Sequence, residues 1–239
     1  MSHVGVVAAL AGEAQALAGR PCRPGQSLAL GDGASVYLGG IGHGRAARAA
    51  AALIEAGARA LVSWGIAGGL DPALRPGDLV LPAAVLGIGN TRYEADQPWR
   101  ARLTESLGAR VRVHAGTMLQ VDQPLRDEAA KRAAFESNGA CAVDMESAAI
   151  AARANRARLP FLVVRSVSDA AEIPIPTGAL IGVDAEGNPR TVALLGWLLR
   201  HPGQLPDVLN MRRTYRAAVA TLRTVAETVG PGLCYQASR

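Results

Sequence analysis

Residues 140–172 read ACAVDMESAAIAARANRARLPFLVVRSVSDAAE, and this stretch decides the fold. A short apolar run gives way at Asp144 and Glu146 to an alanine-rich helical pattern. A second apolar run, Phe161–Val164, leads to Asp169 in a predicted Ser-Asp turn. Carboxylates at strand ends lie where α/β sheets form their ligand crevice. Alternatively, Asp144 and Glu146 only cap a helix, as acids near a helix N-terminus do. The stretch alone leaves both interpretations open.

The same strand-to-helix pattern occurs upstream. Val4–Leu10 is an apolar run typical of a buried first strand, and it places Glu13 at a strand-to-helix turn. Ala60–Trp64 predicts another buried strand, followed by the glycine-rich segment Gly65–Leu70, where a ligand could approach the backbone closely. For Glu13 the alternative is an exposed acid in the first turn of a helix. Four strand ends are therefore expected to deliver acids and a glycine-rich loop to one crevice.

Strands and helices alternate along the whole chain. Further strands are predicted at Leu79–Leu86, with an irregularity at Pro82, and at Val111–Leu119. Residues 20–34 are predicted to form loops and turns. Residues 173–178 predict a loop able to cover the crevice, and two helical patterns follow at 191–200 and 206–229. This alternation predicts an α/β protein, a single three-layer α/β/α domain with a central mixed, twisted sheet.

A glycine-rich segment, Gly39–Arg45, joins a predicted strand to a helix. It lacks the acidic residue that would complete a dinucleotide-binding fingerprint. Backbone amides at a helix N-terminus still form a natural oxyanion site. Gly42, Gly44 and Arg45 are therefore the candidate site for inorganic phosphate as a co-substrate.

Composition narrows the class of protein. Of 239 residues, 49% are hydrophobic and only 4% aromatic, so the core is built from small aliphatic side chains. Three cysteines without metal-type spacing predict reduced thiols, no metal site and a cytoplasmic location. The first residues lack a basic segment, which disfavours a signal peptide.

The net charge of +5 lies in the last 50 residues, where seven arginines outnumber Asp207 and Glu227. Trp197, Tyr215 and Tyr235 are too widely spaced there to interleave with a basic patch, so nucleic acid is not the expected partner. Lys131 is the only lysine.

The acids suit a neutral, hydroxyl-rich substrate, because ionised carboxylates accept hydrogen bonds only. Two further carboxylates in different environments could divide into an acid and a base.

Four motifs together resemble the nucleoside phosphorylase superfamily, and within it the methylthioadenosine/adenosylhomocysteine nucleosidases. They occur in the family's order across residues 1–172. The motifs are Val4–Leu10 leading to Glu13, Gly65–Leu70 with Arg75–Asp78, Val143–Ala151, and Val164–Asp169.

The resemblance implies a role for each acid. Asp169 would be the general acid that protonates adenine N7, and Glu13 would orient or deprotonate the attacking water. Glu146 would bind the ribose hydroxyls, with Met145 packed against the sugar and Asp144 flanking it. An oxocarbenium-like transition state would be stabilised by the charge of Glu146. The resemblance also implies a homodimer and three further substrate contacts, Ser168, Ala67 and Gly68.

Several positions depart from the nucleosidase pattern. Ile66 stands where nucleosidases place a serine, and Asp144 where they place a glutamate. The superfamily's phosphate-binding arginine and serine are missing near Ser63 and Ile66, and no aromatic ring is available near Gln123-Pro124. Water and phosphate therefore both remain open as the nucleophile.

The C-terminal part is similar to the hopanoid-associated phosphorylases. The similarity lies in Asp184–Arg190, Leu194–Pro202 and Asn210–Arg213. It implies release of adenine from adenosylhopane, with the helices at about 191–229 as a subgroup-specific extension. The apolar segment Leu194–Leu199 beside a basic tail would suit a lipid-linked substrate or peripheral membrane contact. The alternatives are two helices that only close the core, a methylthioadenosine/adenosylhomocysteine or futalosine nucleosidase, and a non-catalytic nucleoside-binding protein.

Overall fold

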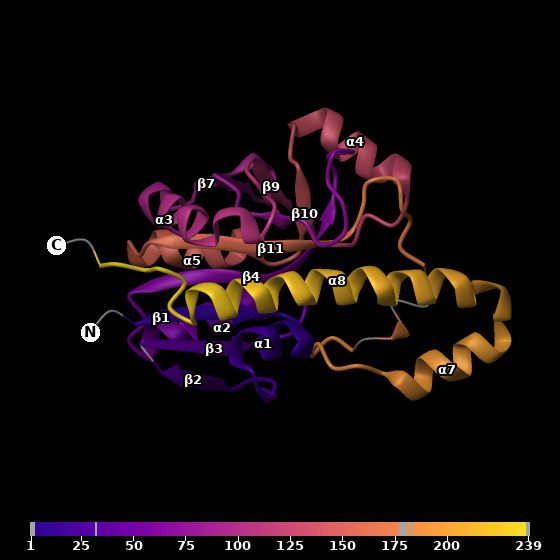
Figure 1. Cartoon of the computed structure of the whole chain (residues 1–239), viewed down its shortest axis with the longest axis horizontal. Coiled ribbons are helices and arrows are strands. Elements are labelled where there is room, and N and C mark those ends of the chain that lie inside the picture. The colour runs from indigo at the N-terminus through magenta and orange to yellow at the C-terminus, as the bar shows by residue number, and fades with distance from the viewer. Residues whose placement is uncertain (1–2, 32, 177–180, 183, 238–239) are drawn as a thin grey trace.

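The computed structural model describes residues 3–31, 33–176, 181–182 and 184–237. Over these residues it forms one mixed eleven-stranded sheet with helices on both faces (Figure 1). The strands are β1 (Val4–Ala8), β2 (Ser27–Gly31), β3 (Ala34–Leu38), β4 (Ala60–Gly69), β5 (Leu79–Val80), β6 (Ala84–Leu86), β7 (Arg92–Glu94), β8 (Val113–His114), β9 (Thr117–Gln120), β10 (Ala142–Asp144) and β11 (Phe161–Asp169). The helices are α1 (Ala11–Ala18), α2 (His43–Glu55), α3 (Gln97–Leu107), α4 (Glu128–Asn138), α5 (Ser147–Ala157), α7 (Thr191–Arg200) and α8 (Leu205–Val229).

Three parallel strands, β1, β4 and β11, form the centre of the sheet. β1 pairs with β4 as far as Ala8 opposite Trp64, and β4 then continues without it. The end of β4 pairs instead with β10, antiparallel at Gly68 and Gly69. β11 accompanies β4 along its length and brings Asp169 opposite Gly68. The divergence of β4 from β1 opens the sheet edge at which the predicted acids lie.

Two apolar layers sandwich the sheet, which confirms the predicted three-layer α/β/α fold. On one face, side chains such as Leu17 of α1, Leu103 of α3 and Leu222 of α8 pack against the strands. On the other face, α2 and α5 pack together through small residues such as Ala49 and Ala151. The alanine-rich patterns allow this close approach, because alanine adds little bulk between helix and sheet.

Five sequence predictions need correction. The predicted loop at Gly65–Leu70 is strand as far as Gly69, because β10 and β11 continue to pair with it. Asp169 is accordingly the last residue of β11 and not part of a turn. The predicted strand Leu79–Leu86 is two strands, β5 and β6, because the irregularity expected at Pro82 is a full interruption: proline cannot donate a ladder hydrogen bond.

The strand predicted at Val111–Leu119 is likewise divided, into β8 and β9. Gly116, with φ of 141°, separates the two pieces. The region 20–34, predicted as loops and turns, contains the strand β2, whose residues are exposed or half-buried because it is an edge strand.

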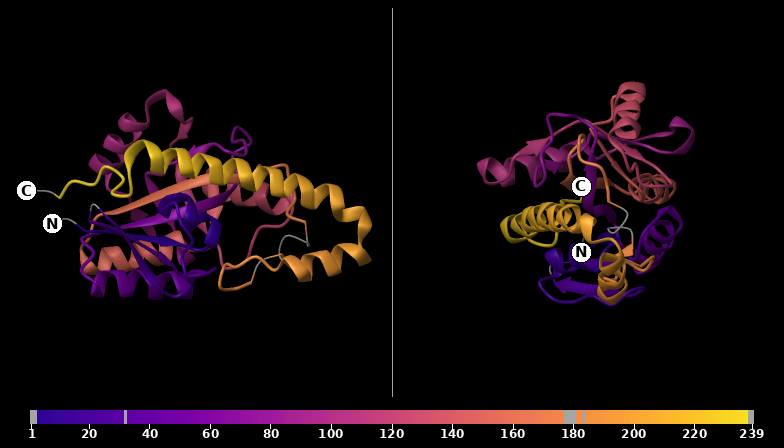
Figure 2. Two further views of the ribbon diagram at one scale, coloured as in Figure 1. Left: turned by 60° about the horizontal axis from the view of Figure 1, so that its bottom comes forward. Right: turned by 90° about the vertical axis from the view of Figure 1, so that its right-hand side faces the viewer.

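The C-terminal helices were predicted at their observed positions. α7 and the start of α8 project beyond the sheet at the end opposite the two termini (Figure 2). α7 has no buried residue, whereas the second half of α8 buries Ala218, Leu222, Val225 and Ala226. Among the described residues, no helix is both long enough and apolar enough to cross a bilayer.

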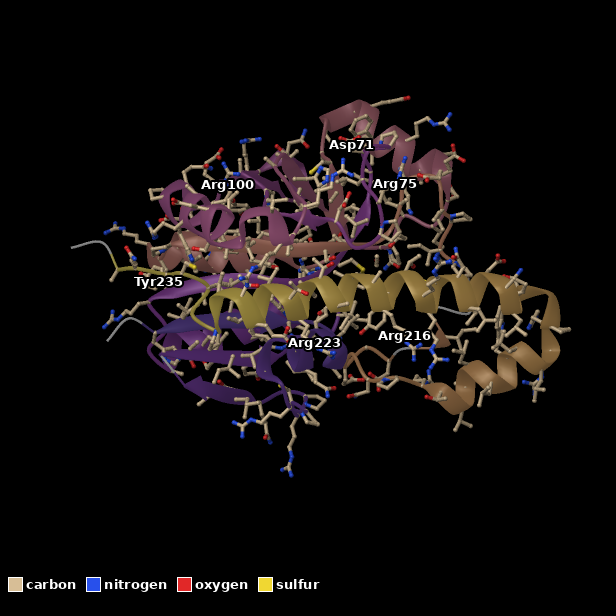
Figure 3. The ribbon with its side chains drawn as sticks, in the orientation of Figure 1. Asp71, Arg75, Arg100, Arg216, Arg223 and Tyr235 are labelled. Atoms are coloured by element: carbon tan, nitrogen blue, oxygen red, sulfur yellow. The ribbon has the colours of Figure 1, made fainter. Side chains whose placement is uncertain are left out.

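The chain after α8 returns to the body. Tyr235 packs against Trp99 of α3 with ring centroids 4.8 Å apart, at the end of the molecule labelled in Figure 3. Arg216 and Arg223 extend from the same side of α8 (Figure 3).

Candidate active site

One cavity of about 280 Å³ lies at the carboxyl ends of β1, β4, β10 and β11. Every predicted catalytic and substrate-contact residue lines it: Glu13, Ala67, Gly68, Asp144, Met145, Glu146, Ser168 and Asp169. The sheet brings them together because parallel strands end at a common edge.

Glu13 is buried in the first turn of α1, so it is not the exposed helix acid of the alternative interpretation. Its Oε2 accepts hydrogen bonds from the amides of Ala9 (2.9 Å) and Leu10 (2.8 Å), and its Oε1 accepts one from Ile66 (2.9 Å). Ile66 follows the point where β4 leaves β1, so Glu13 completes the backbone pairing there. Burial raises the pKa of the Glu13 carboxyl, against the opposing effects of Arg165 and of these amides.

Arg165 of β11 organises the acids of this half of the cavity. Its side chain is buried, with Nη2 2.7 Å from Asp144 Oδ2, 3.6 Å from Glu146 Oε2 and 2.9 Å from Ser63 Oγ. Its Nη1 donates to the carbonyl of Ile66 at 3.1 Å. The sequence interpretation gave Arg165 no role, although a charged residue inside the apolar run FLVVRSV is a signal for a buried ion pair.

Asp144 and Glu146 have different roles, so each of the two sequence interpretations describes one of them. Asp144 Oδ1 accepts from the amides of Glu146 (3.3 Å) and Ser147 (3.2 Å), which is helix capping. Glu146 makes no such cap and instead accepts from the amide of Gly42 at 2.7 Å. Burial raises the pKa of Glu146 to about 7, opposed by Arg165 and reinforced by Asp144.

At the other end of the cavity, Asp169 has both oxygens occupied. Oδ2 accepts from Lys131 Nζ at 2.6 Å, and Oδ1 accepts from Ser168 Oγ at 2.6 Å. Lys131 comes from α4, and its side chain is 1% exposed. Its role was missed because α4 has the charged, amphipathic pattern of a surface helix. The available signal was that it is the only lysine in the chain.

The predicted phosphate loop is arranged differently. Gly42 precedes α2 as expected, but its amide already donates to Glu146. Arg45 pairs with Glu186 at 2.8 Å, and neither it nor Gly44 lines the cavity. Phosphate at this loop would therefore have to displace existing contacts, and its binding remains a prediction.

The rest of the cavity wall is apolar. None of the described lining residues is aromatic, in line with the missing ring near Gln123-Pro124. Ile66 lines the wall where nucleosidases were expected to place a serine, and Met211 reaches it from α8. Of the predicted covering loop, residues 173–178, the described part contributes Ile175, and residues 177–178 lie outside the described structure. Among described side chains, no cluster of three or more His, Cys, Asp or Glu is placed to hold a metal ion.

Comparison with known families shows to which family this chain belongs. Residues 3–190, which make up most of the chain, match the phosphorylase superfamily. The chain belongs to the phosphorylase superfamily. The match ends immediately before α7, so the projecting helices lie outside it.

Within the superfamily, curated relatives are nucleosidases. The 5'-methylthioadenosine/S-adenosylhomocysteine nucleosidases of Mycobacterium bovis and Mycobacterium tuberculosis are both 29% identical over 167 residues. These alignments cover 54% of this chain and 63% of each relative, so this superfamily member spans less than two thirds of their length.

Solved structures show the same fold at lower identity. The 5'-methylthioadenosine/S-adenosylhomocysteine nucleosidase of Neisseria meningitidis, in complex with methylthio-immucillin-A, superposes with a TM-score of 0.68 at 22% identity, covering 96% of this chain and 99% of that one. Futalosine hydrolase of Helicobacter pylori gives a TM-score of 0.66 at 16% identity, covering 95% and 97%.

Proposed function

We propose that this superfamily member cleaves the N-glycosidic bond of an adenosine-type nucleoside and releases adenine. One observation carries the proposal: three buried acids, Glu13, Glu146 and Asp169, arrive from different strand ends and line one cavity of about 280 Å³. Burying several carboxylates is costly, and clusters of this kind mark functional sites. The curated nucleosidase relatives support the same reaction class.

The two ends of the cavity suit the two halves of a nucleoside. We name Glu13, Asp144, Glu146 and Arg165 the sugar end, and Lys131, Ser168 and Asp169 the base end. At the sugar end, ionised Glu146 accepts hydrogen bonds from the ribose hydroxyls and stabilises the developing oxocarbenium charge. Met145, the neighbour of Glu146, packs against the sugar.

At the base end, Asp169 carries a proton when the substrate is bound and transfers it to adenine N7. The electron pair of the C1'–N9 bond then leaves with neutral adenine. Such acid catalysis contributes about 10²–10⁴-fold to rates. Glu13 accepts a proton from the attacking water, for which its raised pKa is favourable because a stronger base removes the proton more readily.

Water is favoured over inorganic phosphate as the nucleophile. The amide of Gly42 is engaged by Glu146, and Arg45 by Glu186. Phosphate remains the alternative co-substrate. It would require Gly42, Gly44 and Arg45 to exchange these partners for its oxygens.

The C-terminal helices favour a nucleoside substrate that carries an apolar, lipid-linked 5'-substituent. The specific proposal is that adenosylhopane is converted to ribosylhopane or phosphoribosylhopane. Met211 connects the cavity wall to α7 and the start of α8. That projecting hairpin exposes Val192, Leu195, Leu199, Leu205 and Leu209. Apolar side chains beside arginines are suited to an anionic membrane surface, from which a lipid-linked nucleoside could enter.

The competing substrate class is methylthioadenosine and adenosylhomocysteine, or futalosine, which the names of the relatives and structural neighbours support. A non-catalytic nucleoside-binding protein is a weaker alternative, because binding alone gives no reason to bury all three of Glu13, Glu146 and Asp169. The homodimer stays a prediction, to be tested by sedimentation velocity.

Product analysis separates these possibilities. Purified protein is incubated with methylthioadenosine and with adenosylhopane in anionic vesicles, each with and without phosphate. We expect adenine from both, faster from the lipid-linked nucleoside and independent of phosphate. No adenine from either substrate would disprove the enzymatic proposal. Adenine release that requires phosphate and yields the sugar 1-phosphate would overturn the assignment of water as the nucleophile.

Membrane contact has its own test. Leu195→Glu and Leu199→Glu together should abolish sedimentation with anionic vesicles while leaving adenine release from soluble methylthioadenosine unchanged. Binding that survives the double substitution would contradict the membrane role of the hairpin.

A further inference from the structure

Lys131 is the only lysine in the chain, and its side chain is almost completely buried. Its ammonium donates to Asp169 Oδ2 (2.6 Å), the carbonyl of Ala170 (2.9 Å) and the carbonyl of Ile173 (2.7 Å). An ammonium has three protons, and each has one acceptor here. A neutral amine has only two N–H groups, so this set of acceptors favours the charged form.

A purely structural role does not explain the choice of residue well. Burial of an ammonium is costly, and apolar side chains of similar volume often replace buried ion pairs without loss of stability. The chain uses arginine at every other basic position. The compact point charge of lysine is what a single carboxylate oxygen and two carbonyls can surround, whereas a planar guanidinium would need a wider arrangement.

The two oxygens of Asp169 differ in how firmly they are held. Ser168 Oγ, the partner of Oδ1, lies 3.2 Å from the carbonyl of Ala67 as well. Because a hydroxyl has one proton, Ser168 can turn it toward Ala67 and free Oδ1. Lys131 has no such alternative, so Oδ2 stays occupied. Any proton that Asp169 carries must therefore sit on Oδ1.

Lys131 also connects the acid to the wall of the cavity. The carbonyls of Ala170 and Ile173 belong to the segment that follows β11 and leads to Ile175, which lines the cavity. The amide of Ile175 donates to the carbonyl of Arg126, just before α4. The ammonium thus holds Asp169 and this segment in one arrangement.

We propose that Lys131 is a positioning residue for the acid: it fixes Oδ2 so that Oδ1 alone delivers the proton to the leaving base. This inference rests on the proposed nucleoside cleavage and adds to it the residue that orients the proton donor. Lys131 lines the cavity, but its ammonium donates to three protein acceptors, so in this role it acts through Asp169.

Substrates with two different leaving groups distinguish a positioning role of Lys131 from a role in folding alone. Adenine needs a proton to depart, whereas p-nitrophenolate from a p-nitrophenyl riboside does not. We expect Lys131→Met to lower kcat for adenine release by about 10²-fold, within the range of general acid catalysis. Nitrophenolate release should change by less than about threefold, because the sugar end is intact. Arg132→Met is the matched control, since Arg132 is exposed on the same helix and should leave both rates unchanged.

Coupling to Asp169 is tested with the double variant. If Lys131 acts only through the acid, Lys131→Met added to Asp169→Asn should lower the rate no further. A parallel fall in release of both leaving groups, or an additive loss in the double variant, would overturn the inference. If wild-type protein releases neither leaving group, the proposed function itself fails; if it releases both and Lys131→Met matches it, only this inference fails.

A second measurement does not require the Lys131→Met variant to fold. Protein labelled with ¹⁵N-lysine has one side-chain Nζ resonance. We expect a slowly exchanging ammonium signal whose chemical shift moves when adenine binds and when Asp169→Asn is introduced. A rapidly exchanging signal that is unaffected by either change would contradict the buried Lys131–Asp169 pair.

Discussion

The sugar end and the base end of the cavity both hold buried carboxylates against a buried cation, but their charge balance differs. At the sugar end, one guanidinium, Arg165, faces Asp144, Glu146 and Glu13. At the base end, one ammonium, Lys131, faces one carboxylate, Asp169. The first end has an excess of acids over cations and the second is balanced.

This difference suits the two halves of the proposed reaction. Excess negative charge favours the cationic sugar of an oxocarbenium-like transition state. While Asp169 is ionised, the balanced pair neither attracts nor repels a neutral purine. When Asp169 carries its proton on Oδ1, the charge of Lys131 is no longer balanced, which favours transfer of that proton to the leaving base. Burial raises the pKa of Glu146 to about 7, with Arg165 opposing the rise and repulsion from Asp144 and Glu13 adding to it. The contrast between the ends can be altered one group at a time.

The largest expected effect comes from removing the acid of the base end. Asp169→Asn retains the size of the side chain but cannot donate a carboxyl proton, so kcat for adenine release should fall by about 10²–10⁴-fold. Steady-state kinetics measures this, with KM for the nucleoside changing little because the sugar end is untouched. An unchanged kcat would show that the base leaves without help from Asp169.

Removal of Arg165, the cation of the sugar end, should lower the stability of the protein. Arg165→Met leaves three buried acids without a counter-charge, and the free energy of unfolding should fall by about 3–5 kcal/mol. Urea denaturation measures the loss, with the exposed Arg223→Met as the control that keeps wild-type stability (Figure 3). Equal midpoints for the two variants would mean that Arg165 is not what compensates the acids.

The pH dependence of kcat/KM should reflect the ionisation of Glu146. Its raised pKa of about 7 means that the carboxylate is lost as the pH falls through neutrality, and with it the acceptor for the ribose hydroxyls. Below that value kcat/KM should fall about tenfold per pH unit, as expected for one essential ionised group. Glu146→Gln should lower kcat/KM and remove this limb of the profile. A limb that persists in Glu146→Gln must belong to another group, of which Glu13 is the first candidate.

The smallest expected effect is at Ser168. Ser168→Ala deletes the hydrogen bond to Asp169 Oδ1 but leaves the Lys131 pair intact, so kcat should fall only about three- to tenfold, the equivalent of one hydrogen bond. Ser137→Ala, at an exposed serine of α4, is the control. A loss as large as that of Asp169→Asn would mean that Oδ1, and not Oδ2, is the firmly held oxygen.

Much of the fold could be predicted from sequence, because apolar runs and alanine-rich patterns report local periodicity. Val4–Leu10 and residues 206–229 are examples, and each corresponds to an observed element. The errors arose where pairing with distant strands overrides local signals. Gly65–Gly69 has the composition of a loop, yet β10 and β11 hold it as strand.

The site was only partly predictable for a related reason. Acids at strand ends can be located by counting from apolar runs, and these were found. The cations that compensate them come from elsewhere: Lys131 lies 38 residues from Asp169 on a helix with a surface-like pattern. Arg165 sits inside a strand, where periodicity gives no indication of its partners.

The division of the cavity into a sugar end and a base end is tested most directly by a crystal structure of the Asp169→Asn variant with methylthioadenosine bound. We predict that the ribose hydroxyls will lie within hydrogen-bonding distance of Glu146, and that adenine N7 will face the side chain at position 169, whose other terminal atom remains on Lys131. A nucleoside bound in the reverse direction, with its base against Arg165 and its ribose beside Lys131, would contradict the account.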